Sequence, residues 1–274
     1  MSSSPAESVR YELLRPDEVV DARRRAPVAF VPVGPHEWHG PHLPLGTDGL
    51  HAWHVAMRTA RLVGGVVLPP LFAGADSLRV AGTGPEKLGT LGLPGDARVV
   101  GMDFPGFPVK STYYDEAVFA LAVRGVVRAL ADDAYRLVVL ANGHGAASHQ
   151  RALDRVAAEE SRPGEIRVIH ANVWVAPTPP NLDPGHAERQ ETAVMLALAP
   201  DRVALDRLPS DGPLAYRDYG IVDGPAFDGE PTNDLTVRPD ADPRRASAVE
   251  GEAILERETA ALAERVRAEL AATG

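Results

Sequence analysis

Short apolar runs that alternate with longer amphipathic segments constrain the fold of this chain more than any other feature of its sequence. The apolar runs are rich in valine and leucine, and four of them predict buried strands: residues 27–33, 65–69, 137–141 and 166–173. Helical periodicity marks the segments between and after them: residues 48–63, 115–132, 146–160, a stretch from about 187, and a closing helix at about 246–272. Strands that alternate with helices predict an α/β fold with a mostly parallel sheet covered on both faces.

We expect the chain to form a single domain over positions 1–274. The sequence shows no internal repeat, low-complexity tract or linker that would divide it. Residues 71–114 are rich in glycine and proline, which predicts loops near a functional site and a short β excursion around 99–104. Residues 200–243 are also predicted to be mostly loop.

The composition excludes several classes of function. A formal net charge of −10 argues against nucleic acid or an anionic membrane as a partner, because both bind basic surfaces. The lack of cysteine excludes disulfides, thiolate metal ligands and a cysteine nucleophile. The polar first ten residues are unlike a signal peptide, and no apolar run approaches the ~20 residues of a membrane span. We therefore expect a soluble, cytoplasmic protein.

A cluster of ionisable residues follows the first predicted strand, and five of the nine histidines lie between positions 36 and 54. In an extended segment Glu37 and His39 point the same way, while Trp38 points to the other side. A carboxylate and an imidazole side by side at a strand end suit a divalent metal ion. Asp48 stands at the start of the next predicted helix, either as a further ligand or simply as the cap of that helix.

Two further clusters occur later in the chain. Asn142-Gly143-His144-Gly145 comes directly after the strand at 137–141, so His144 is expected at the same sheet edge as the first cluster. An ordinary Asn-Gly turn would explain the glycines but not the histidine. His186 and Glu191 lie at the start of the helix near 187, where a solvated helix start rich in acidic residues is the competing interpretation.

The segments PVGPHEWHGPHLPLGTD, LANGHG and HAERQET closely resemble the three signature segments of the creatininase family, over roughly residues 27–200. The first segment is long and specific, whereas the other two gain weight from their order and spacing. The resemblance implies a three-layer αβα sandwich and a binuclear metal site that hydrolyses C–N bonds in small molecules. It also implies a homo-oligomer, with a hexamer favoured.

The resemblance assigns ligands by motif position. Glu37, Asp48 and His144 match the ligands of one divalent ion, and His39 with a bridging Asp48 matches ligands of the other. Carboxylates and imidazoles suit zinc, manganese and iron alike, so the two ions are not identified. Sharing Asp48 and a water, two ions about 3.5–4 Å apart would lower the pKa of that water and polarise a carbonyl.

The remaining catalytic roles fall on the third cluster. In creatininase a glutamate two residues after the second-cluster histidine completes the second ion, but Ala146 stands there in this chain. Glu191 is interpreted as its replacement, with both a metal-binding and a catalytic role. His186 is expected to protonate the departing nitrogen, since an unperturbed histidine has a pKa of about 6.5.

The surroundings of the third cluster argue against creatinine as the substrate. Creatininase has a tryptophan and a glutamate shortly before its third-motif histidine, whereas residues 182–185 of this chain read Leu-Asp-Pro-Gly. Asp183 keeps a polar group there, and with Trp38 and Tyr113 it is a candidate for substrate binding. We expect a bulkier or less basic amide, formamide or lactam. A metal-dependent lyase, cyclase or isomerase that uses the same site without net hydrolysis is the main alternative, and a non-enzymatic protein on a decayed scaffold is the other.

Overall fold

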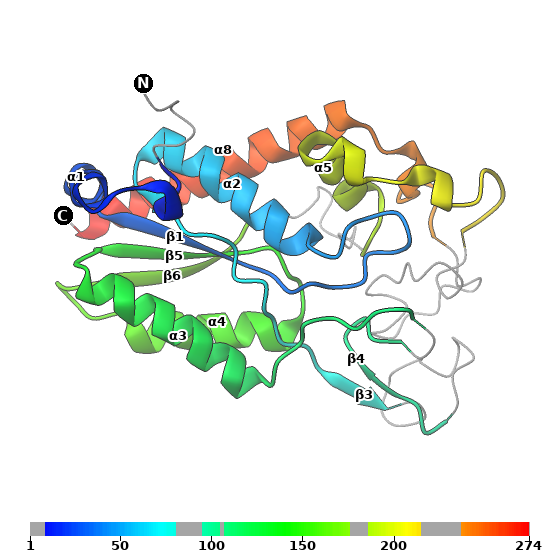
Figure 1. Ribbon diagram of the computed structural model, residues 1–274, viewed down its shortest axis with the longest axis horizontal. Coiled ribbons are helices and arrows are strands. Elements are labelled where there is room, and N and C mark those ends of the chain that lie inside the picture. The colour runs from blue at the N-terminus through cyan, green and yellow to red at the C-terminus, as the bar shows by residue number, and fades with distance from the viewer. Residues whose placement is uncertain (1–8, 81–94, 105–106, 176–185, 215–236, 274) are drawn as a thin grey trace.

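The computed structural model describes residues 9–80, 95–104, 107–175, 186–214 and 237–273 of the chain. At its centre is a four-stranded parallel sheet with the strand order β2–β1–β5–β6 (Figure 1). These strands are β1 (Val28–Val33), β2 (Val66–Val67), β5 (Leu137–Asn142) and β6 (Arg167–Asn172). A separate antiparallel pair is formed by β3 (Leu78–Val80) and β4 (Arg98–Val100).

Helices cover both faces of the sheet, which confirms the predicted αβα layers (Figure 1). One face carries α2 (Thr47–Val63), α5 (Arg189–Leu198) and α8 (Ala248–Thr273). The other carries α3 (Glu116–Asp132) and α4 (Ala147–Glu160). The other described helices are α1 (Pro16–Arg25) and the 3-10 helices η2 (Tyr11–Leu13), η4 (Pro200–Arg202), η5 (Leu205–Arg207) and η6 (Pro243–Arg245). None of the helices in the described ranges is long and apolar enough to cross a bilayer.

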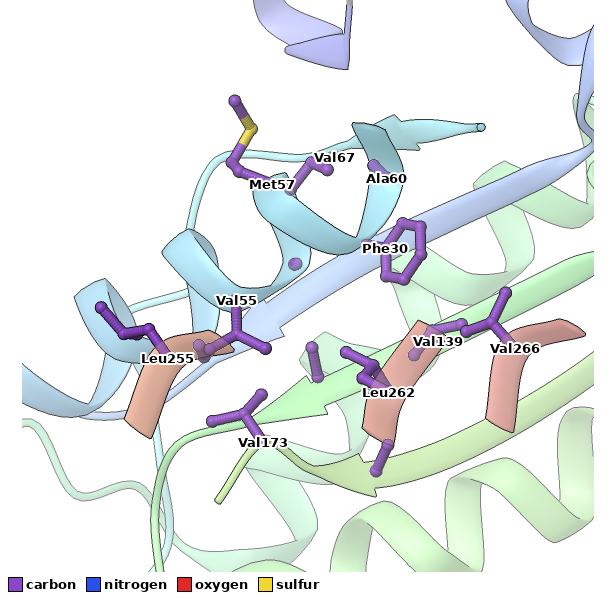
Figure 2. Packing of buried hydrophobic residues seen from close by; sticks show 14 of the residues in the cluster. Phe30, Val55, Met57, Ala60, Val67, Val139, Val173, Leu255, Leu262 and Val266 are labelled. Carbon is purple, nitrogen blue, oxygen red and sulfur yellow. The ribbon is translucent and has the colours of Figure 1, made fainter. Parts of the chain in front are cut away.

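Alternating side chains along the strands divide the core into two apolar layers. Val28 and Phe30 of β1 pack with α2 and α8, whereas Ala29 packs with α3 and α4. Every residue of β1 and of β5 is buried, as expected for central strands of a parallel sheet. Figure 2 shows the first layer, in which Phe30 and Val139 of the sheet lie close to Leu262 of α8.

Most predicted boundaries agree with the structure to within two residues. Asp115, for example, accepts a hydrogen bond from the Ala117 N–H at 2.9 Å, which fixes the start of α3. The strand predicted at 65–69 is shorter than expected, because Pro69 and Pro70 have no N–H with which to extend the ladder. The β excursion predicted around 99–104 is present, but its strand ends at Val100.

Candidate metal centre

Carboxylate and imidazole side chains converge beyond the carboxyl ends of β1 and β5. They form three overlapping groups in which the donor atoms lie within 4.8 Å of one another: Glu37–Asp48–His144, His39–Asp48–Glu191 and Glu37–His39–His186. The first two groups are the two ligand sets that the sequence predicts, and Asp48 belongs to both. The structure thus brings together six residues from three separate motifs.

Asp48 lies in the first turn of α2, with its carboxylate buried between two imidazoles. Its Oδ1 is 3.0 Å from Nε2 of His39, and its Oδ2 is 3.0 Å from Nδ1 of His144. Gly46 is the N-cap residue of α2 and Asp48 lies inside the helix, so the interpretation of Asp48 as the helix cap is wrong. A carboxylate whose two oxygens face different histidines has the geometry needed to bridge two cations.

Glu37 is buried in the loop between β1 and α2. The loop folds back on itself, and the Glu37 N–H donates to the carbonyl of Leu45 at 2.8 Å. The Oε2 atom of Glu37 lies 3.4 Å from Nδ1 of His144 and 3.9 Å from Nε2 of His39. The other oxygen, Oε1, accepts a hydrogen bond from the Tyr113 hydroxyl.

His39 and His186 each form a hydrogen bond to a backbone carbonyl with one ring nitrogen and turn the other nitrogen toward the site. Nδ1–H of His39 donates to the Glu37 carbonyl at 3.1 Å, which leaves Nε2 to face Asp48. Nε2–H of His186 donates to the Trp38 carbonyl at 2.6 Å, which leaves Nδ1 at 3.8 Å from Oε2 of Glu37. The ring centroids of the two histidines are 4.4 Å apart. The backbone bonds therefore fix which nitrogen of each ring faces the site.

The turn after β5 positions His144. Asn142 accepts a hydrogen bond from the His144 N–H at 2.8 Å, and its amide donates to the His144 carbonyl at 2.9 Å. Gly143 brings this turn against the start of α2, since a Cβ at position 143 would fall 2.8 Å from the carbonyl carbon of Asp48. The glycine of the second motif is thus required by close packing between the segments that carry Asp48 and His144.

Glu191 lies on the first turn of α5, where the helix dipole favours a carboxylate. Its Oε2 is 3.9 Å from Nε2 of His39 and accepts a hydrogen bond from the Ala187 N–H at 2.5 Å. Ala187 has a φ of 55°, in the left-handed region that alanine seldom adopts. The chain therefore keeps a strained residue at the point where it turns its N–H toward Glu191.

The charges of the site shift the pKa values of its buried groups. Burial alone would lower the pKa of His39, but Asp48 and Glu191 raise it to about 10. Burial would also lower the pKa of His144, but Glu37 and Asp48 raise it well above its usual value. Against the effect of burial, the imidazoles hold the pKa values of Glu37 and Asp48 below the ordinary carboxyl range. Buried carboxylates that stay ionised require positive charge beside them, which a divalent cation supplies.

The donor set therefore fits a metal ion. It consists of carboxylate oxygens and imidazole nitrogens, the ligands that suit zinc, manganese and iron. Each ligand group offers three protein donors, which leaves a coordination position for water or substrate, as catalytic metal sites require.

The three residues predicted to bind substrate differ in placement. Trp38 is half-buried and packs its ring against Phe107, with ring centroids 4.9 Å apart. Tyr113 turns into the site and donates to Glu37, while burial and the Glu37 carboxylate raise its pKa well above the usual value. Asp183 lies outside the described residues.

Two residues beside His144 were not identified from the sequence. The Oδ2 atom of Asp76 lies 3.9 Å from Nε2 of His144, and the ring of His149 meets the His144 ring edge-on at 5.0 Å. Asp76 follows the apolar segment after β2, so an acidic residue beyond a strand end was the available signal. His149 lies inside α4, and a histidine within a helix gives no comparable signal.

Comparisons with known proteins find relatives that match most of the chain. The family model described as Creatininase: Creatinine amidohydrolase matches residues 12–266. The chain is 28% identical to the creatinine amidohydrolase of Pseudomonas putida over 262 residues, which cover 90% of this chain and 91% of that protein. It is 30% identical to the mycofactocin precursor peptide peptidase of Mycolicibacterium smegmatis over 248 residues, with 88% and 85% covered. A solved structure named Creatininase Mn is similar with a TM-score of 0.66 and 26% identity, covering 95% of this chain and 98% of its own. A creatininase variant of Zn-Zn type has a TM-score of 0.65 and 26% identity, with 98% and 99% covered.

Proposed function

Because the chain belongs to the creatininase family of amidohydrolases, we propose that it hydrolyses a C–N bond of a small amide, formamide or lactam at a binuclear metal centre. The shared place of Asp48 in two ligand groups, with one oxygen turned toward each, is the observation that supports this most directly. In the reaction, water adds to the carbonyl carbon, the C–N bond breaks and a proton moves to the departing nitrogen. The products are a carboxylic acid and an amine, which remain joined when the substrate is a lactam.

The proposed ligands are divided between two ions. Glu37, Asp48 and His144 would hold one ion, and His39, Asp48 and Glu191 the other. Two divalent ions bound in this way lower the pKa of a shared water and polarise the substrate carbonyl. The solved relatives named for manganese and for a Zn-Zn form support metal dependence without selecting the ion for this chain.

His186 is proposed as the residue that carries the proton. Its Nε2–H is held by the Trp38 carbonyl, so Nδ1 is the nitrogen turned toward the site. A neutral imidazole accepts a proton from the attacking water at Nδ1 and donates it to the departing nitrogen. The same ring also belongs to a third ligand group with Glu37 and His39, so its role has to be separated from that of a ligand by experiment.

Metal content tests the ligand assignment. We expect up to two divalent ions per purified chain, and Asp48→Asn should lose most of both because that carboxylate joins the two groups. Asp17→Asn, at an exposed position of α1, is the matched control and should keep both ions. Unchanged metal content in the Asp48→Asn variant would refute the assignment.

Metal content and turnover together should distinguish the roles of His186 and Glu191 in the third motif. His186→Ala should keep its metal and lower turnover by roughly 10²–10⁴-fold, the usual effect of losing a positioned acid or base. Glu191→Gln should instead weaken the binding of one ion. If His186→Ala loses metal and Glu191→Gln does not, the two roles are reversed.

We propose that creatinine is not the substrate. The Leu-Asp-Pro-Gly sequence at 182–185 supports this, and the two curated relatives, at 28% and 30% identity, are named for creatinine and for a precursor peptide. Lactams, formamides and creatinine should be assayed in ¹⁸O-labelled water, with label expected in the carboxylate product. A kcat/KM for creatinine of about 10⁴ M⁻¹s⁻¹ or higher would contradict the proposal. Turnover without incorporated label would favour the lyase, cyclase or isomerase alternative.

We further propose that the chain forms one domain and assembles in the cytoplasm as a homo-oligomer, with a hexamer favoured. Sedimentation velocity of the metal-loaded protein tests the assembly, and limited proteolysis tests the single domain. A monomer in the first experiment, or two separately stable fragments in the second, would contradict the corresponding part.

A further inference from the structure

The hydroxyl of Tyr113 lies between a carboxylate oxygen and a backbone amide. It donates its proton to Oε1 of Glu37 and accepts a hydrogen bond from the N–H of Met102 at 3.1 Å. A phenol has a single proton to donate. Since that proton is directed at Glu37, Tyr113 has none to offer to a substrate.

This bond gives the two oxygens of Glu37 different surroundings. Oε1 is bound to Tyr113, whereas Oε2 lies 3.4 Å from Nδ1 of His144, 3.8 Å from Nδ1 of His186 and 3.9 Å from Nε2 of His39. A carboxylate can bind a metal ion through one oxygen or through both. With Oε1 held by the phenol, Oε2 is the oxygen with which Glu37 would bind an ion.

The ring of Tyr113 occupies space that a glycine leaves open. Gly101 has a φ of 52°, and a Cβ there would fall 2.5 Å from Cε2 of Tyr113 and closer still to its Cζ and hydroxyl oxygen. The next residue, Met102, supplies the N–H that holds the hydroxyl. The turn after β4 therefore provides both the room for the phenol and the donor that orients it.

The backbone around Tyr113 is tied to the loop that carries Glu37. The Thr112 N–H donates to the His36 carbonyl at 2.8 Å, and the Thr112 hydroxyl accepts a hydrogen bond from the His36 N–H at 2.8 Å. Tyr113 and Glu37 directly follow these two paired residues. Their relative position is thus fixed by the backbone as well as by their own contact.

We infer that Tyr113 is a positioning residue of the metal centre, which holds Glu37 as a single-oxygen ligand and is itself held by the turn after β4. This rests on the proposed function, because it requires that Glu37 binds a divalent ion. It replaces the sequence-based interpretation of Tyr113 as a contact for substrate. It also gives the β3–β4 pair a role in the site, because the turn that follows β4 holds the Tyr113 hydroxyl, which in turn contacts Oε1 of Glu37.

Removal of one oxygen tests the inference. Tyr113→Phe should lower the affinity for Zn²⁺, measured against a competing chelator, by roughly 10–100-fold, the usual effect of losing a partner of a metal ligand. It should also change the visible absorption spectrum of the Co²⁺-loaded protein, because Glu37 becomes free to bind through both oxygens. Tyr114→Phe is the matched control at the neighbouring, exposed position and should leave both measurements unchanged.

A further variant moves the phenol without removing it, and it has its own control. Gly101→Ala should reproduce the loss of Zn²⁺ affinity, because the new Cβ displaces the Tyr113 ring. Gly164→Ala places the same strain at a φ of 76°, where no described atom lies within 4 Å of the new Cβ, and should bind Zn²⁺ normally. All variants are compared in the cold, below their midpoints of thermal unfolding. If Tyr113→Phe does not fold, the two glycine variants decide.

The outcomes distinguish this inference from the function on which it rests. A wild-type protein that binds no divalent ion contradicts the proposed function itself. A wild-type protein with two ions and a Tyr113→Phe variant with the same affinity and Co²⁺ spectrum overturns the inference alone. A raised KM with unchanged metal binding would return Tyr113 to the role of a substrate contact.

Discussion

Replacing Gly143 with alanine should push apart the two segments that supply Asp48 and His144. A Cβ at position 143 would fall 2.8 Å from the carbonyl carbon of Asp48 and closer still to its oxygen. Carbon atoms make favourable contacts at about 3.5–4.0 Å, so the turn after β5 and the start of α2 must separate by roughly 1 Å. Both sides of the contact are main chain, so no side-chain rotation can relieve it.

The displacement acts directly on two proposed ligands. His144 is the next residue after Gly143, and its Nδ1 lies 3.0 Å from Oδ2 of Asp48. Metal–ligand distances are set to within about 0.2 Å, and a misplacement of ~1 Å can lower activity by roughly 10²-fold. We expect Gly143→Ala to lower the affinity for both ions by about 100-fold, because the two proposed sites share Asp48. The overpacking should also lower the free energy of unfolding by about 1–3 kcal/mol.

Gly145→Ala is the matched control on the other side of His144. No described atom lies within 4 Å of a Cβ at position 145, so the free energy of unfolding should change by no more than about 0.5 kcal/mol. Both variants are titrated with Zn²⁺ against a chelator and unfolded in urea without metal. If Gly143→Ala keeps wild-type affinity for two ions, Asp48 and His144 do not act together as ligands in the way proposed.

Two further predictions concern α8. Gly251→Ala should lower the free energy of unfolding by about 2 kcal/mol, because its Cβ would fall 2.9 Å from the backbone nitrogen of Val194 in α5. Gly125→Ala in α3 is the control: no described atom lies within 4 Å of its Cβ, so helix propensity should raise the free energy of unfolding by about 1 kcal/mol. Midpoints of thermal unfolding that shift in the same direction for the two variants would contradict this prediction. Glu258→Gln should lower stability by about 3 kcal/mol near pH 6, because Glu258, at 2.6 Å, raises the pKa of His51 against the effect of burial. That contribution to stability is fully present below the unfolded pKa of about 6.5 and is lost as the pH rises through the raised folded pKa of His51. Urea titrations near pH 6 and pH 9 should therefore show that the difference in stability between variant and wild type shrinks at the higher pH. A constant difference would contradict the role of His51.

The parts of the fold that the sequence predicts well are those decided by their own residues. β1 and β5 are apolar along their whole length, and α3 begins at an aspartate that caps it. β2 and β4 are predicted less well, because each is two or three residues long and depends on its neighbour for its hydrogen bonds. Short elements carry too few residues for a period to be recognised.

The same distinction applies to the site. The first and second motifs meet because β1 and β5 pair in parallel register, with Val33 opposite Asn142, so the loops after the two strands lie at one edge of the sheet. The contact between His51 and Glu258 joins residues 207 positions apart, and neither segment has a sequence pattern that predicts it. Tyr113 was recognised as an aromatic residue near the site, but its role depends on a turn shaped by Gly101.

The positions of the carboxylates follow from the direction in which the strands and helices run. Each strand of a parallel sheet ends where the next helix begins, so α2, α4 and α5 all start around this site. A helix N-terminus carries a charge of about +0.5 and favours a nearby carboxylate, which is where Asp48 and Glu191 lie. Glu37 is in a loop and has no helix to stabilise its charge; the imidazoles lie farther from it than from Asp48, and it accepts a hydrogen bond from the Tyr113 hydroxyl. The extra hydrogen bond on Glu37 is therefore expected on physical grounds, since this proposed ligand lacks the helix dipole that favours the other two carboxylates.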